Sequence, residues 1–188
     1  MRQINTEIIT AAVHRSEKQK LLPVQKTNLP EACIIAKMVE TVWHLYQKNG
    51  RPFSLEKSIG VIVPYRNQIA MIRHELDRLE LKELHDITID TVERYQGSER
   101  EVIIYGFTIQ KRYQLDFLTG NVFEEDGNRI DRKLNVALTR AREQLFLVGN
   151  PYLLNLDPLF QHLISFVKQA GIYLDVPYMD FCEDHFLY

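Results

Sequence analysis

Two arginines that suit a phosphate group lie at the end of an expected helix, residues 131–142. Apolar side chains recur on one face of this segment at spacings of three and four, and Arg140 and Arg142 lie off that face. At about 100° per residue the two guanidinium groups point to opposite flanks, so we expect them to have separate tasks. Arginine stays charged, and its planar donors reach two phosphate oxygens at once. The alternative is that both are solvated surface arginines.

A second segment, residues 96–99, has the sequence Gln-Gly-Ser-Glu and connects two expected strands. Open α/β sheets bind their ligands at strand ends. Gly97 would allow a ligand to approach the backbone, Gln96 can donate or accept a hydrogen bond, and an ionised Glu99 can only accept one. Gln96 and Glu99 could therefore contact a phosphate and a sugar hydroxyl, respectively. The alternative is an ordinary turn.

The elements that must position these residues alternate between strands and helices. Short apolar, β-branched runs predict strands near residues 59–63, 87–92, 101–108 and 145–148. Helical patterns occupy several of the intervals between them. This alternation predicts an α/β fold in which a mainly parallel sheet lies between helices.

Two helices have well-marked boundaries. Asn28 stands three residues before Glu31, which predicts a helix start with a capping-box-like pair, and the Asn-Gly of residues 49–50 predicts its end. A later helix is expected to begin after Asp157 and to stop at Gly171. The domain core is therefore expected to span about residues 28–171.

Three segments fit the alternation less well. Residues 7–24 suggest a strand or a hairpin with a charged turn. Residues 109–132 lack sustained periodicity, and we expect a long surface excursion with the acidic residues 124–126 in a glycine-bearing loop. The aromatic and acidic tail, residues 172–188, could pack on the domain or dock against a neighbouring one.

The composition is that of a soluble globular domain. The 188 residues are 45% hydrophobic and 26% charged, with a net charge of −2, so the chain does not coat nucleic acid over its whole surface. Cys33 and Cys182 lack metal-ligand spacing and are expected to be reduced thiols. No leader segment and no apolar run of about 20 residues is found, so we expect one cytoplasmic domain without membrane contact.

The chemical segments resemble the conserved motifs of superfamily one helicases. Residues 89–104 resemble motif five, and residues 134–142 followed by residues 148–151 resemble motif six and its next strand. Residues 59–68 are similar to motif four, and residues 28–31 to the helix start that leads into it. The branch with the nonsense-decay and replication-associated helicases is the most similar. The resemblance implies a RecA-like, P-loop NTPase-type three-layer sandwich, the second motor domain of such a protein.

The same resemblance implies a role for each matching residue. Arg140 would be the catalytic arginine finger that stabilises charge on the γ-phosphate. Gln96 and Gly97 would contact the nucleotide phosphates, and Glu99 would hydrogen-bond the ribose. Arg66 and Arg142 would also contact the nucleotide. Thr91 and Tyr65 would contact the nucleic acid.

The chain also departs from a complete motor. None of its eight glycines belongs to a Gly-x-x-x-x-Gly-Lys-Ser/Thr phosphate loop, and no strand ends in an acidic pair for Mg²⁺. ATP with Mg²⁺ would therefore be held mainly by an N-terminal RecA-like domain of the same protein, and the chain would be inactive alone. Its other partner would be single-stranded DNA or RNA.

Two other functions compete with the motor domain. One is a non-catalytic nucleic-acid or protein-binding module with a RecA-like fold, which would have no need for Gln96, Glu99 and Arg140. A nuclease is less favoured, because the acidic residues Asp86, Asp90 and Glu101 lack a following acid-x-Lys arrangement.

Overall fold

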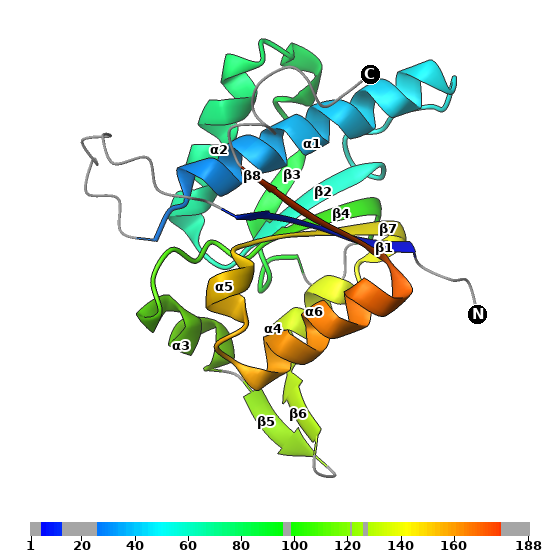
Figure 1. Cartoon of the computed structure of the whole chain (residues 1–188). Coiled ribbons are helices and arrows are strands. Elements are labelled where there is room, and N and C mark those ends of the chain that lie inside the picture. The colour runs from blue at the N-terminus through cyan, green and yellow to red at the C-terminus, as the bar shows by residue number, and fades with distance from the viewer. Residues whose placement is uncertain (1–4, 13–25, 96–98, 121, 126–127, 178–188) are drawn as a thin grey trace.

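A computed structural model describes residues 5–12, 26–95, 99–120, 122–125 and 128–177. Its centre is a six-stranded sheet with the order β3-β2-β4-β7-β1-β8, in which every neighbouring pair is parallel (Figure 1). The strands are β1 (Asn5–Ala12), β2 (Ile59–Val63), β3 (Thr88–Thr91), β4 (Arg100–Gly106), β7 (Ala141–Val148) and β8 (Ile172–Pro177).

Helices cover both faces of the sheet (Figure 1). One face carries α1 (Leu29–Lys48) and α2 (Arg66–Arg78), and a short 3₁₀ turn (Lys82–Leu84) leads from α2 to β3. The opposite face carries α4 (Arg132–Leu138), α5 (Pro151–Leu154) and α6 (Pro158–Ala170). The α/β, RecA-like three-layer arrangement expected from the sequence is confirmed.

The central strands are apolar along their length because both of their faces are covered. All five residues of β2 are buried. Ile59, Val61 and Val63 pack into the cluster beneath α1 and α2, whereas Ile62 packs into the cluster on the opposite face. The expected strand over residues 59–63 is confirmed at both ends.

The start of α1 is also as expected, with one difference. The Asn28 side-chain oxygen accepts from the Glu31 backbone N–H at 3.2 Å, and α1 ends before Asn49, with Gly50 at φ +60°. The Glu31 carboxylate does not complete the capping box. It accepts instead from the backbone N–H of Thr108, at the end of β4, at 2.7 Å.

The prediction of a helix over residues 131–142 is wrong for its last turn. α4 ends at Leu138, Thr139 and Arg140 form a turn, and Arg142 belongs to β7. β7 pairs with β4 from Ala141 and with β1 from Gln144, and this pairing overrides the helical periodicity. The two arginines are therefore separated by the change from turn to strand, not by rotation around a helix.

The excursion over residues 109–132 is regular rather than a structureless loop. It contains α3 (Tyr113–Thr119) and an antiparallel hairpin of β5 (Val122–Glu125) and β6 (Asn128–Asp131). The acidic residues 124–125 thus lie in a strand, and residue 126 lies outside the described residues. These elements are four to seven residues long, too short for a periodic pattern to stand out.

The sheet extends beyond the expected core at both ends. The early strand is confirmed as β1, but it forms no described hairpin and instead pairs in parallel with β7 and β8. The first six residues of the tail are β8. The rest of the tail, and the charged turn expected within residues 13–25, lie outside the described residues.

Candidate nucleotide and nucleic-acid sites

The parallel sheet separates the candidate residues into two groups. Tyr65, Arg66 and Thr91 lie at the carboxyl ends of β2 and β3. Arg140 and Glu99 lie at the amino ends of β7 and β4, one residue before each strand, and Arg142 is the second residue of β7. Because all six strands run in the same direction, these groups occupy opposite edges of the sheet. Gln96 and Gly97 lie outside the described residues.

A cleft of about 410 Å³ lies at the carboxyl edge. Three basic side chains line it, and its other residues come from the ends of β2 and β3. The lining residues are Lys26, Pro64, Tyr65, Arg66, Asn67, Thr91, Glu93 and Arg94. The cleft therefore gathers all three carboxyl-edge candidates in one place.

The one acidic residue in this lining is bound to a neighbouring lysine. Lys133, in the first turn of α4, places its Nζ 2.7 Å from Glu93 Oε1. Burial opposes ionisation of Glu93, but the hydrogen bond and charge of Lys133 together with backbone donors lower its pKa below the ordinary value. The basic side chains of the cleft therefore face a carboxylate whose charge is already compensated.

Tyr65 contributes a covered ring rather than a free one. It is only 5% exposed, and the ring of Phe117 stacks on it with centroids 4.7 Å apart. Burial raises the pKa of Tyr65. Thr91 is also buried, and its carbonyl accepts from the backbone N–H groups of Arg94 and Tyr95, which form a turn beside the cleft. Sequence reasoning missed Phe117, because it lies in the excursion.

The segment after Thr91 links the two edges. It leaves the carboxyl end of β3 and reaches the amino end of β4, while β2 lies between these strands in the sheet. Tyr95 packs so closely over β2 that a Cβ at Gly60 would stand 1.7 Å from its hydroxyl oxygen. Glycine at position 60 is required by this approach. Burial of Tyr95 raises its pKa to about 12.

At the amino edge, the candidate residues contact one another. Arg142 Nε donates to Glu99 Oε2 at 2.8 Å, and the Arg140 carbonyl accepts from the Arg100 backbone N–H at 3.0 Å. The Nε of Arg140 is buried and has no hydrogen-bond partner among the described residues. A charged donor in this state fits an anionic oxygen supplied by a ligand.

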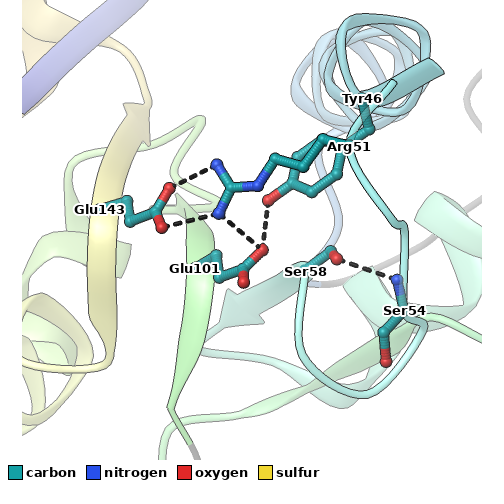
Figure 2. Close-up of polar contacts among 6 residues, drawn as sticks. All are labelled: Tyr46, Arg51, Ser54, Ser58, Glu101 and Glu143. Carbon is teal, nitrogen blue, oxygen red and sulfur yellow. Dashed lines mark hydrogen bonds and ion pairs between the residues drawn. The ribbon is translucent and has the colours of Figure 1, made fainter. Parts of the chain in front are cut away.

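A polar cluster holds the same ends of β4 and β7 to the end of α1 (Figure 2). Arg51 donates two hydrogen bonds to Glu143 of β7, both at 2.7 Å, and lies 3.2 Å from Glu101 of β4. The hydroxyl of Tyr46 donates to Glu101 at 2.6 Å, and burial together with this carboxylate raises the Tyr46 pKa. The cluster joins the amino ends of β4 and β7, which Glu99 and Arg140 directly precede and where Arg142 lies.

A buried network supports the carboxyl edge. Gln68 of α2 is fully buried, and its side chain accepts from the Asn28 backbone N–H at 2.7 Å and donates to the Asn28 carbonyl at 2.9 Å. The Asn28 amide in turn donates to the Ile109 carbonyl at 3.3 Å. Burial raises the pKa of Glu31, which also belongs to this network, to about 8. Sequence periodicity offers no signal for buried polar residues of this kind.

The described part of the chain has no group of three or more His, Cys, Asp or Glu side chains that could hold a metal ion. No helix among the described residues is long and apolar enough to cross a membrane.

A family model described as "AAA domain" matches residues 2–152. The chain belongs to this AAA-domain family. A DNA replication ATP-dependent helicase/nuclease DNA2 from Xenopus laevis is 34% identical over 154 residues, which are 81% of this chain and 13% of the relative. The resemblance to superfamily one helicases of the nonsense-decay and replication branch is confirmed.

Two further relatives are a regulator of nonsense transcripts and an RNA helicase. Regulator of nonsense transcripts 1 from Dictyostelium discoideum is 34% identical over 151 residues, 79% of this chain and 10% of the relative. RNA helicase Mov10l1 from Homo sapiens is 36% identical over 129 residues, 63% of this chain and 10% of the relative. The helicase-family domain thus spans only 10–13% of the length of these three curated relatives.

Proposed function

We propose that this chain is the second RecA-like motor domain of an ATP-dependent DNA or RNA helicase. It supplies the arginine finger. It also forms part of the nucleotide site and part of the cleft that binds the single strand. An N-terminal RecA-like domain of the same protein holds most of the nucleotide, including Mg²⁺. The family match supports a helicase domain, and the geometry of the amino edge supports this particular role.

The observation that carries the proposal is the state of Arg140. Its carbonyl is fixed to β4 through Arg100, while its buried Nε has no partner among the described residues. Arg140 is partly buried, and a guanidinium donor without an acceptor in this domain supports a role in which a ligand oxygen accepts from it. The Arg142–Glu99 pair stands on the same edge, at 2.8 Å.

These residues have distinct tasks at the nucleotide. Bound ATP with Mg²⁺ supplies the γ-phosphoryl group and the metal charge that offsets its oxygens. Arg140 donates to a phosphate oxygen and stabilises the negative charge that develops there. Glu99 accepts a hydrogen bond from a ribose hydroxyl, and Arg142 orients that carboxylate. Gln96 and Gly97 are proposed to contact the phosphates.

The carboxyl-edge cleft binds the single strand. Thr91 and the turn after it contact the phosphate backbone, and the cations of the cleft offset the phosphate charge. Arg66 lines this cleft, at the edge opposite Arg140. We therefore assign Arg66 to the single strand of nucleic acid rather than to the nucleotide. Tyr65 lines the same cleft, where its ring packs against Phe117.

The test is nucleic-acid-stimulated ATP hydrolysis by the full-length helicase. Arg140→Ala should lower kcat by about a thousandfold or more, because a finger contributes on that scale, while single-strand affinity stays near the wild-type value. Arg140→Lys should restore little, because an ammonium lacks the planar fork of donors. Lys48→Ala, which removes an exposed cation at the end of α1, is the control.

The same measurement distinguishes the non-catalytic module. Wild-type turnover in Arg140→Ala would refute the finger. A full-length protein that binds single strands but hydrolyses no ATP would favour a nucleic-acid-binding module with this fold. Comparing single-stranded DNA with RNA in the same assay identifies which nucleic acid stimulates ATP hydrolysis more strongly.

A further inference from the structure

Phe117 is an aromatic ring displayed at the rim of the single-strand cleft. It is 44% exposed, and one side of it stacks on the nearly buried ring of Tyr65 at 4.7 Å with an interplanar angle of 28°. Tyr65 therefore cannot offer that face to a ligand. Of this stacked pair, Phe117 carries the exposed aromatic surface.

Basic side chains surround this ring. The Nζ of Lys26 lies 5.7 Å from the Tyr65 centroid and 5.8 Å from the Phe117 centroid, and the Nζ of Lys133 lies 5.2 Å from the Phe117 centroid. Lys26, Arg66 and Arg94 also line the adjoining cleft. An exposed ring among cations suits a ligand that has both flat apolar groups and regularly spaced negative charges.

The helix that carries Phe117 is firmly held. The Gln114 side chain accepts from the backbone N–H groups of Gln110 and Lys111 at 2.8 and 2.9 Å, which closes the turn before α3. Leu115 and Leu118 are buried in the cluster beneath the sheet. The ring is thus presented from a fixed element, which limits the entropy lost when a ligand orders it.

We propose that Phe117 stacks on a base of the bound single strand, with Lys26 beside the adjoining phosphate. This inference rests on the proposed function. It gives the excursion between β4 and α4, which carries Phe117, a role in binding the single strand. Stacking on a ring tolerates every base, because each base has a π face, so the contact grips the strand without selecting its sequence. The charge of the cleft favours a polyanion over a protein partner.

The experiment measures binding of fluorescent oligonucleotides to the 188-residue chain. One oligonucleotide carries bases, and a second of equal length has abasic sugars at the central positions. Wild-type protein should bind the base-bearing strand about tenfold more tightly, a ratio within the range of a single base–aromatic stack. Phe117→Ala should abolish that ratio, and Phe117→Tyr should retain it.

Two variants separate stacking from folding. Phe117→Leu keeps apolar contact with Tyr65 but has no aromatic face, so it should remain folded by circular dichroism and still lose the base preference. Phe166→Ala removes an exposed phenylalanine from α6, on the layer beneath the sheet, and should bind both strands as the wild type does.

The outcomes distinguish the two proposals. If the wild type binds both strands equally and Phe117→Leu changes nothing, stacking is overturned while the single-strand cleft stands. If the wild type binds neither strand and instead captures a protein through this surface, both the cleft and the stacking contact are overturned. Loss of the base preference in Phe117→Ala and Phe117→Leu, with retention in Phe117→Tyr, supports the proposal.

Discussion

Glu31 is a carboxyl group inside the protein, and the described partners of its side chain are the neutral donors of Thr108. Its Oε1 accepts from the backbone N–H of Thr108 at 2.7 Å and from the Thr108 hydroxyl at 3.1 Å, and its Oε2 has no hydrogen-bond partner among the described residues. Desolvation exceeds the effect of these donors and raises the Glu31 pKa from 4.5 to about 8. The residue is therefore protonated at neutral pH in the folded state.

This raised pKa predicts a pH-dependent stability. Between about 4.5 and about 8 the folded state keeps a proton that the unfolded state has lost, so the free energy of unfolding falls as the pH rises. Glu31→Gln keeps the acceptor for Thr108 and cannot ionise. It should be more stable than wild type at pH 8.5 by roughly 2 to 4 kcal/mol, with a smaller difference at pH 5.

Urea unfolding at the two pH values measures the effect. Glu56→Gln is the control, because Glu56 is exposed before β2 and its replacement should change stability by less than about 0.5 kcal/mol at either pH. An equal difference between Glu31→Gln and wild type at pH 5 and pH 8.5 would argue against a protonated Glu31.

At the scale of elements, Gln68 connects three segments that carry the cleft. Its side chain bonds both backbone groups of Asn28, at the start of α1, and Asn28 bonds the Ile109 carbonyl, just after β4. Gln68 itself lies in the first turn of α2, two residues after Arg66. One fully buried side chain thus joins α1, α2 and the segment that leads to α3.

Removing this connection should destabilise the domain. Gln68→Leu leaves the buried N–H and C=O of Asn28 without partners, and we expect a loss of roughly 2 to 4 kcal/mol in the free energy of unfolding. The measurement is chemical denaturation monitored by circular dichroism. Gln161→Ala removes an exposed glutamine that also bonds a backbone carbonyl, at 2.6 Å, and should cost less than about 0.5 kcal/mol. Equal losses in the two variants would contradict the role of burial.

At the scale of the whole molecule, the two proposed sites lie at opposite edges of one sheet. The single-strand cleft lies beyond the carboxyl ends of β2 and β3, and the nucleotide residues lie beyond the amino ends of β4 and β7. The crossover after Thr91 runs between the edges, with Tyr95 packed over Gly60. The two proposed sites therefore share this crossover, while the described contacts of each site lie at its own edge of the sheet.

The separation predicts that variants at the two edges have different kinetic signatures. In the full-length helicase, Arg94→Gln should weaken single-strand binding and reduce its salt dependence by about one phosphate contact, with the KM for ATP unchanged. Glu99→Gln should raise the KM for ATP by about tenfold with single-strand affinity unchanged. Binding titrations at several salt concentrations and steady-state ATPase assays provide both readouts. Parallel changes in both quantities for either variant would contradict two separate sites.

The sequence alone determined much of the fold. The apolar strand at residues 59–63, the Asn28 start of α1 and the helix between Asp157 and Gly171 were predicted correctly, because each depends on local patterns of burial and capping. The helicase family also followed from local motifs. The roles of Arg140, Glu99 and Thr91 remain predictions that rest on those motifs.

The tertiary structure decided the features that depend on distant segments. Arg142 became part of a strand because β7 pairs with β4 from Ala141 and with β1 from Gln144, and β8 completed the sheet from residues that resembled a tail. The division of the candidate residues between two edges follows from strand order and direction, which no local pattern encodes. The stack of Phe117 on Tyr65 joins residues 52 positions apart in the sequence (117 minus 65), and only folding brings them together.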